Sequence, residues 1–283
     1  MSVKLSAKST FETYRYLCHL MDKNKKVYYA RFGDGDIFIM MGMSQQNHDY
    51  HPELGKEMDE AFSIEDPLYL KGLTLNYPVE KGMFRGFFAH YKNNDEMNDF
   101  LINKFKIKED KIYESQWFMQ YYSIYKPKEM VYFLDTYIRP KKKMFIGGVP
   151  KEDIEQLVGR IDYYINTPHK NSYWKIDEWW PKVLEHIDDV ELVLPASGMS
   201  TRIINKRLWN MNKEVHSIDL GSIVDAVGNP KNTRRWIRIR SHVLNKILLP
   251  EYQKKGILYN IEFWFKEIHF LVRKWHFLLK HRY

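Results

Sequence analysis

Residues 28–36 read YYARFGDGD, a β-prone run that ends in two aspartates separated by one glycine. The first part predicts a strand over residues 27–32, because aromatic side chains fit a pleated, half-buried surface. Gly33 and Gly35 provide backbone freedom around Asp34 and Asp36. Open α/β sheets bind their ligands at the carboxyl ends of strands. The stretch therefore predicts a binding site directly after the first long strand.

Asp34 and Asp36 are the expected metal ligands. Two carboxylates on a short turn suit Mg²⁺ or Mn²⁺, which takes one or two protein carboxylates and completes its shell with substrate phosphates and water. Arg31 offers a planar guanidinium fork for phosphate. The substrate that this pattern indicates is a nucleotide diphosphate. The same tripeptide also forms ordinary turns, because Asp bonds its own backbone and Gly tolerates positive φ.

The rest of the chain predicts an α/β fold. Helices are expected at residues 10–23, 52–63, 94–105, 128–137, 151–158, 172–186 and 200–210, and strands at 27–32, 68–75, 143–146, 161–165, 191–194 and 215–220. Strands that alternate with helices favour a Rossmann-like, mostly parallel sheet covered by helices. We expect residues 1–230 to form this domain and residues 231–283 to form a C-terminal basic amphipathic helical extension.

Two further strand ends carry polar residues. Ser197, Gly198, Ser200 and Thr201 join a strand to a helix, so their amides and hydroxyls could cradle a phosphate. Ordinary capping of that helix explains the same residues. Asn76 follows the strand expected at 68–75 and could contact a base, a ribose or a sugar hydroxyl, or else stabilise a turn.

Five segments together resemble one family. They are RFGDGD at 31–36, SQWF at 115–118, PHKNSY at 168–173, VLPASG at 193–198 and SIDLGS at 217–222. Over roughly residues 10–230 the chain is similar to the GT-D type glycosyltransferases, formerly a domain of unknown function, which act in bacterial surface-glycan and glycoprotein glycosylation. The family has Glu where this chain has Asp36, and an arginine of its second segment is replaced here.

The resemblance implies a metal-dependent glycosyltransferase, with hexosyl transfer expected. Asp34 and Asp36 would bind Mn²⁺ or Mg²⁺ and, through it, the diphosphate of a nucleotide sugar, expected to be a UDP-sugar. The acceptor would be a glycan, a glycolipid or a glycoprotein. Two alternatives stay open: a metal-dependent nucleotide phosphohydrolase, and a non-enzymatic interaction protein associated with a membrane.

Asp219 and Asp225 are the candidate catalytic acids. Asp219 ends the strand expected at 215–220, where a carboxylate could accept the proton of an incoming hydroxyl. A turn or helix cap before Ser222 is the competing explanation for Asp219.

The positive charge belongs to the C-terminal extension. From Lys231 onward there are 13 basic and three acidic residues, a balance of +10, against 31 basic and 33 acidic residues before it, a balance of −2. Ile257, Ile261, Trp264 and Ile268 begin a run of apolar residues at helical spacing that continues to Leu278. A basic amphipathic helix of this kind is typical of a membrane interface. Packing on the domain or on a second subunit explains it equally well, whereas nucleic acid binding is not expected.

Composition and the single cysteine bear on the size of the core and on the cellular compartment. A chain of 283 residues with 44% hydrophobic residues can form a large core. Cys18 is the one cysteine, which excludes an internal disulfide and fits a reducing compartment. Residues 1–10 lack the apolar core of a signal peptide. We therefore expect a cytoplasmic protein, with the inner face of the cell membrane as a candidate location.

Overall fold

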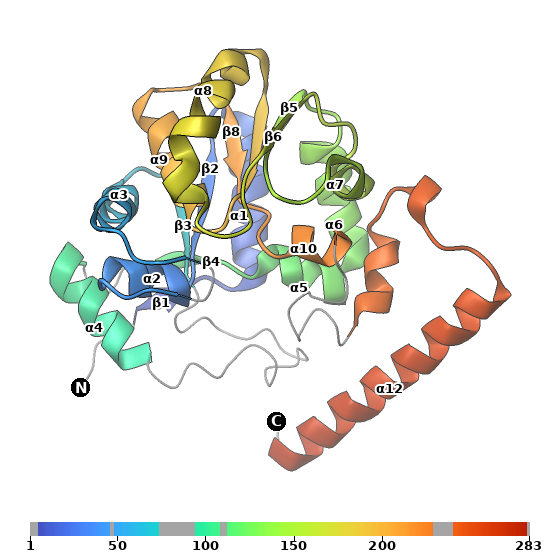
Figure 1. Cartoon of the computed structure of the whole chain (residues 1–283). Coiled ribbons are helices and arrows are strands. Elements are labelled where there is room, and N and C mark those ends of the chain that lie inside the picture. Colours follow the sequence, from blue (N-terminus) through green and yellow to red (C-terminus); the bar gives the residue numbers. More distant parts are fainter. Residues whose placement is uncertain (1–4, 46–47, 74–93, 108–111, 229–239, 282–283) are drawn as a thin grey trace.

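The computed structural model describes residues 5–45, 48–73, 94–107, 112–228 and 240–281. It contains an eight-stranded sheet in the order β1-β4-β3-β2-β8-β7-β5-β6, and every neighbouring pair is parallel (Figure 1). The strands are β1 (Ser6–Ala7), β2 (Tyr28–Phe32), β3 (Tyr69–Leu73), β4 (Ile112–Ser115), β5 (Lys143–Gly147), β6 (Tyr163–Asn166), β7 (Leu192–Ala196) and β8 (His216–Ile218). The expected Rossmann-like α/β fold is confirmed.

Helices cover both faces of the sheet (Figure 1). They are α1 (Thr10–Lys23), α2 (Asp34–Met40), α3 (Pro52–Ser63), α4 (Asn94–Phe105), α5 (Phe118–Tyr125), α6 (Pro127–Phe133), α7 (Lys151–Val158), α8 (Ile176–His186), α9 (Ser200–Asn210), α10 (Ile223–Gly228) and α12 (Ile257–His281). A π-helical turn, η2 (Leu134–Ile138), and the 3₁₀ turns η3 (Ser172–Lys175), η4 (Ile187–Asp189), η5 (Ser241–Lys246) and η6 (Pro250–Tyr252) complete the described elements.

Two hydrophobic cores lie on opposite faces of the sheet, because successive strand residues point to opposite sides. Tyr29 and Phe145 belong to one core, which α1, α5, α6 and α7 cover. Tyr28, Met144 and Val193 belong to the other, which α2, α3, α8 and α9 cover. All five residues of β2 are buried, and all but Arg31 are apolar or aromatic, as is typical of a strand covered on both faces.

The local signals at two helix starts explain their positions. Ser9 caps α1, since its hydroxyl accepts from the Glu12 amide at 3.2 Å while the Glu12 carboxylate accepts from the Ser9 amide at 2.8 Å. Helix α3 begins at Pro52, which lacks the amide hydrogen that a first helical residue leaves unpaired.

The C-terminal extension ends in α12, a 25-residue helix that projects from the rest of the molecule (Figure 1). It contacts the body through one side: Glu267 pairs with Arg240 and His242, and Phe270 lies against Tyr125 of α5. None of the described helices is sufficiently long and apolar to cross a bilayer.

Candidate active site

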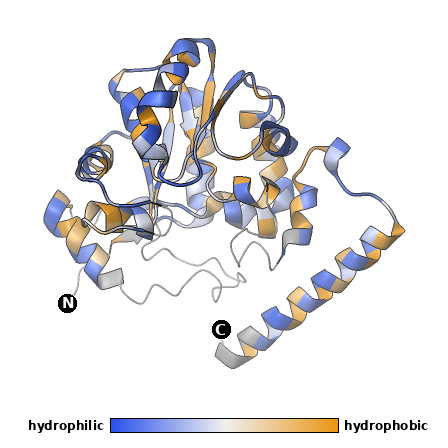
Figure 2. Cartoon of the chain, viewed as in Figure 1, coloured by the Kyte–Doolittle hydropathy of each residue, from blue (hydrophilic) through white to orange (hydrophobic). Residues whose placement is uncertain are grey.

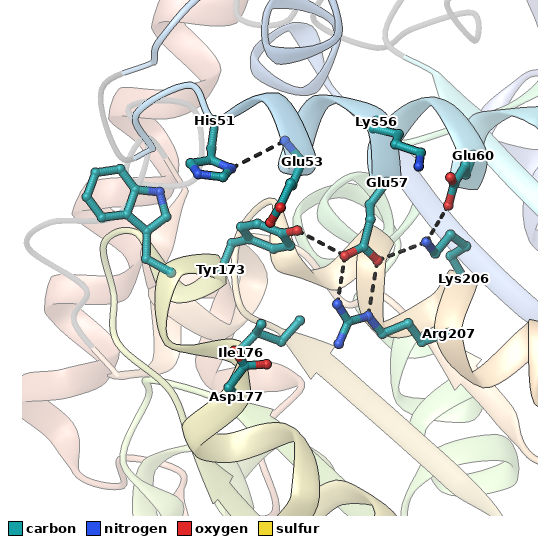
Figure 3. Close-up of a pocket in the computed structure, with 11 residues that line it drawn as sticks. His51, Glu53, Lys56, Glu57, Glu60, Tyr173, Ile176, Asp177, Lys206 and Arg207 are labelled. Carbon is teal, nitrogen blue, oxygen red and sulfur yellow. Dashed lines mark hydrogen bonds and ion pairs between the residues drawn. The ribbon is translucent and has the colours of Figure 1, made fainter.

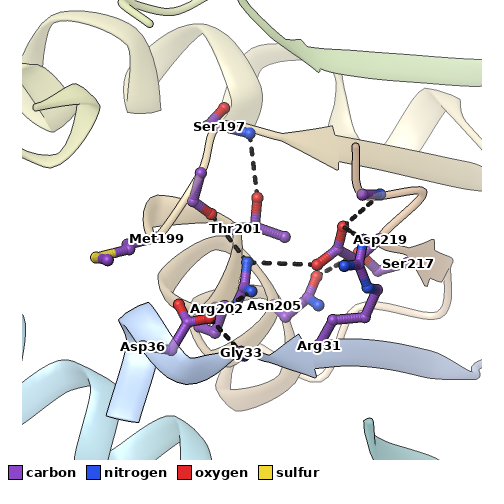
Figure 4. A network of polar contacts seen from close by, with 12 residues as sticks. Arg31, Gly33, Asp36, Ser197, Met199, Thr201, Arg202, Asn205, Ser217 and Asp219 are labelled. Atoms are coloured by element: carbon purple, nitrogen blue, oxygen red, sulfur yellow. Dashed lines mark hydrogen bonds and ion pairs between the residues drawn. The ribbon is translucent and has the colours of Figure 1, made fainter. Parts of the chain in front are cut away.

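Four charged side chains meet at the carboxyl ends of three neighbouring strands (Figure 4). Arg31 lies on β2, Asp36 lies in the first turn of α2, and Asp219 follows β8. Arg202 extends from α9, the helix that follows β7. All four residues are buried, and we call them the Arg-Asp cluster.

The charges of the Arg-Asp cluster alternate. Arg202 Nη2 lies 2.7 Å from Asp36 Oδ2, and its Nη1 lies 3.3 Å from Asp219 Oδ2. Arg31 Nη1 lies 3.7 Å from Asp219 Oδ1. Burying charges is tolerated only when they are paired, and here each carboxylate faces a guanidinium group. Two adjacent guanidinium groups at a strand edge are well suited to recognise phosphate oxygens.

Asp36, like Asp219, keeps one carboxylate oxygen without a hydrogen-bond partner among the described residues. Its Oδ2 accepts from the Gly33 amide at 2.7 Å and from Arg202, while its buried Oδ1 finds no hydrogen-bond partner among the described residues. Burial raises the pKa of Asp36 to about 6, against the opposing effects of Arg202 and the Gly33 amide. A buried oxygen with no partner is costly, and a bound ligand that donates to it or coordinates it removes that cost.

The segment around the two aspartates is helical and does not form the expected turn. Helix α2 begins at Asp34, with Gly33 as its N-cap, so Asp34 and Asp36 occupy the first and third helical positions. Helical residues two positions apart point in different directions. Asp36 accordingly points inward to Arg202, and Asp34 is only half-buried. Glycine favours a turn here, but the two acids favour the first turn of a helix, and the helix prevails.

Asp34 and Asp36 are the donors that α2 offers to a divalent cation. The described part of the chain holds no group of three His, Cys, Asp or Glu residues placed to bind one. Mg²⁺ and Mn²⁺ can be held by one or two carboxylates when substrate phosphates supply further oxygens. Asp36 Oδ1 is an oxygen without a partner in the described structure, and Asp34 is a second carboxylate in the same helical turn. Asp36 therefore fits as one ligand of an ion that a phosphate-bearing ligand completes, whereas Asp34 points in a different direction from the same helical turn.

The loop between β7 and α9 is held mainly by its own hydroxyl groups. The Ser197 hydroxyl donates to the Ile146 carbonyl at 3.0 Å, and the Thr201 hydroxyl accepts from the Ser197 amide at 3.1 Å. Ser200 shares a 2.7 Å hydrogen bond with Ser172. Gly198 has φ +58°, and a methyl group there would lie 2.5 Å from His48 Nε2. These four residues fix the start of α9, and Gly198 also accepts from Arg202 through its carbonyl oxygen at 2.9 Å.

The remaining predicted site residues are dispersed. Gly35 lies in α2, where an added methyl group would come 3.2 Å from Met199 Cε. Asp225 lies on α10 with an exposed side chain, in contrast to the buried Asp219. Asn76 falls outside the described residues.

Sequence reasoning missed Arg202 and two glutamines. Gln116 and Gln120 are buried after β4, and the Gln116 Oε1 atom and both amide atoms of Gln120 find no hydrogen-bond partner among the described residues. Gln116 Oε1 lies 3.5 Å from the place where a side chain at Gly33 would begin. An arginine in the first turn of a helix that follows a strand was a signal that could have identified Arg202.

A separate cavity of about 830 Å³ lies between α3, η3, α8 and α9 (Figure 3). Its centre is occupied by paired charges: Glu57 accepts from Arg207 at 2.7 Å and from Tyr173 at 2.9 Å, and it lies 2.8 Å from Lys206. Burial alone would raise the pKa of Glu57, but the hydrogen bonds from Arg207 and Lys206 outweigh it and lower that pKa to about 2. The members of the Arg-Asp cluster do not line this cavity.

The fold and the cluster define an α/β protein with a buried group of paired charges at the carboxyl ends of its central strands. The family model described as glycosyltransferase GT-D fold matches residues 29–229, and the chain therefore belongs to the GT-D glycosyltransferase family. No curated protein sequence matches this chain.

Solved structures share the fold. A glycosyltransferase (DUF1792) structure from Streptococcus sanguinis is 19% identical with a TM-score of 0.55, covering 78% of this chain and 82% of that one. A structure described as the domain of unknown function 1792 with a distinct glycosyltransferase fold is 19% identical with a TM-score of 0.55, covering 80% and 82%. A selenomethionine-substituted structure of the same domain is 20% identical with a TM-score of 0.54, covering 78% and 79%.

Proposed function

We propose that this chain is a metal-dependent glycosyltransferase that moves a sugar, expected to be a hexose, from a nucleotide diphosphate donor to a glycan, glycolipid or glycoprotein acceptor. Membership of the GT-D family supports glycosyl transfer as the reaction class. The observation that carries the donor and metal assignment is the buried Asp36 Oδ1 without a partner among the described residues, next to the guanidinium groups of the Arg-Asp cluster. We place the reaction in the cytoplasm, consistent with a single cysteine.

Asp34 and Asp36 would hold Mn²⁺ or Mg²⁺, which as a Lewis acid neutralises the charge that develops on the departing diphosphate. Arg31 and Arg202 would donate to phosphate oxygens, and their planar groups favour one orientation of the donor. The Arg31 and Arg202 Nε atoms are buried and find no hydrogen-bond partner in the described structure, so both side chains retain donor capacity.

Asp219 lies between the two guanidinium groups, and its Oδ1 accepts from the Gly221 amide at 2.8 Å. We propose that it positions Arg31 and Arg202 for the donor. That Asp219 or Asp225 takes the proton from the hydroxyl group of the acceptor stays a prediction. Comparing Asp219→Asn with Asp225→Asn in a transfer assay tests it.

A thermal-shift panel of nucleotide sugars, with and without Mn²⁺, tests the proposal. We expect one donor, a UDP-sugar first, to raise the melting temperature only when Mn²⁺ is present, and Asp36→Asn to abolish that shift. Glu57→Gln is the matched control, because it also removes a paired carboxylate, a partly buried one that lies outside the Arg-Asp cluster. Phosphate release without any sugar acceptor would favour the phosphohydrolase, and no shift with any donor would contradict the proposal.

A further inference from the structure

Helix α12 has a broad apolar face that the body leaves uncovered. Ten large apolar side chains on it are exposed, among them Trp264 at 63% and Trp275 at 65%: Ile257, Leu258, Ile261, Trp264, Phe265, Ile268, Leu271, Val272, Trp275 and Leu279. At ~100° per residue, they fall within one arc of about 140°. A soluble surface seldom exposes so continuous an apolar patch unless it binds something.

The side of α12 that faces the body is a different one. Tyr259 donates to the His242 carbonyl, Phe263 lies against the His242 ring, and Glu267 pairs with Arg240. Phe270, on the same side, is 3% exposed. The helix is therefore already docked through a narrow strip, and its apolar arc points away from that strip. Figure 2 shows the apolar and polar residues of α12 side by side along its length.

Charge identifies the occupant of the apolar face. The chain from Lys231 onward has 13 basic against three acidic residues, whereas the rest of the protein is close to neutral. Two copies of so basic a segment would repel each other across a shared apolar face. An anionic lipid surface instead attracts the lysines and arginines while it accepts the apolar side chains. Tryptophan is the residue best suited to the boundary between headgroups and acyl chains.

We propose that α12 lies in the plane of an anionic lipid surface, with its apolar arc inserted and with neighbouring basic side chains, including Lys254 and Lys255, against the headgroups. In Figure 1, α12 extends from the side of the molecule on which α2, α5 and α10 follow the carboxyl ends of β2, β4 and β8. Binding would therefore bring the Arg-Asp cluster to the lipid. This consequence, which favours a lipid-linked acceptor, rests on the proposed function; the lipid binding itself does not.

The test measures binding of the full chain to vesicles without nucleotide or metal, so a failure of the proposed donor does not affect it. We expect sedimentation with vesicles of phosphatidylcholine and phosphatidylglycerol, little sedimentation with phosphatidylcholine alone, and release by salt. Trp264→Ala with Trp275→Ala should weaken binding by about tenfold or more. Lys254→Gln with Lys255→Gln should weaken it by about fivefold for each lysine.

Trp174→Ala is the matched control, since Trp174 is 57% exposed on η3, outside α12, and its removal should leave vesicle binding unchanged. Equal binding to neutral and anionic vesicles, or none to either, would overturn the proposal. Light scattering tests whether a second copy of the chain covers the apolar face instead. A dimer that forms without lipid and that Trp264→Ala dissociates would also overturn the proposal.

Discussion

Gly221 makes room for one of the two guanidinium groups. Its φ is +63°, and a methyl group on it would lie only 1.0 Å from Arg31 Nη1. Its amide donates to Asp219 Oδ1 at 2.8 Å. The same residue therefore holds the carboxylate from one side and permits the guanidinium to approach from the other.

Gly221→Ala should cost stability and weaken donor binding. The backbone alone should account for about 1–2 kcal/mol of unfolding free energy, and the displaced Arg31 should reduce donor affinity by about tenfold. Gly159→Ala is the control, since φ there is +76° but the nearest atom would lie at an ordinary 3.5 Å. Denaturant unfolding and donor titration measure the two effects, and equal results for both variants would contradict the role of Gly221.

Arg202 compensates two buried carboxylates at once. Arg202→Met should lower the free energy of unfolding by about 3 kcal/mol, because Asp36 and Asp219 would then remain buried without the positive charge that pairs with both of them. Asp36→Asn in the same background should restore part of that loss, since it removes one of the charges. Urea unfolding of the two single variants and the double variant forms a double-mutant cycle. Additive losses would mean that the two side chains are not coupled.

Helices α3 and α9 are joined by the Glu57 ion pairs described above. The carboxylate is 15% exposed, and its pKa is lowered to about 2 from its ordinary value of 4.5. A lowered native pKa of an acid adds stability above its unfolded pKa, and that stability is lost as the pH falls through the native pKa.

Glu57→Gln should therefore reduce stability at neutral pH by no more than about 3 kcal/mol. The difference between wild type and variant should shrink between pH 4.5 and about 2, the range set by the two pKa values. Unfolding by urea at several pH values measures this difference. A difference that stays constant across that range would show that the charge of Glu57 contributes nothing.

The local sequence predicts the bounds of some helices and strands correctly and misses others. Helices α1, α3, α4, α7 and α9 begin and end as expected. A clear start or stop signal marks three of them: the Ser9 capping box for α1, Pro52 for α3 and Gly159 after α7. Strand β4 and helix α5 were not predicted. The segment SQWF and the tyrosines that follow it are buried, so their sequence lacks the alternation of apolar and polar residues that distinguishes a strand from a helix.

The same limit applies to the candidate site. Arg31, Asp36 and Asp219 were identifiable because each stands at the end of an expected strand, and the structure brings them together. Arg202 joins them only through the parallel pairing of β7 with β8 and of β8 with β2. Pairing between strands distant in the chain is a tertiary property that local pattern does not encode, which is why the Asp36 partner was not predicted.

At the scale of the whole molecule, α12 is attached through few contacts. Glu267→Gln should weaken its pairing with Arg240 and His242 and so speed hydrogen exchange along residues 257–281, while exchange in the sheet stays unchanged. Glu262→Gln is the control on the same helix, because Glu262 pairs only with the exposed Lys266 among the described residues. Faster exchange throughout the sheet would show that α12 supports the global fold.

The order of the strands has a consequence for biosynthesis. β2 and β8 are neighbours in the sheet, yet β2 ends at Phe32 and β8 begins at His216. A ribosome that adds ~5–20 residues per second would release the first strand many seconds before the second. Until α9 and β8 have been made, Asp36 lacks Arg202 and its folded surroundings, so a nascent chain truncated before α9 should have no capacity to capture a sugar donor.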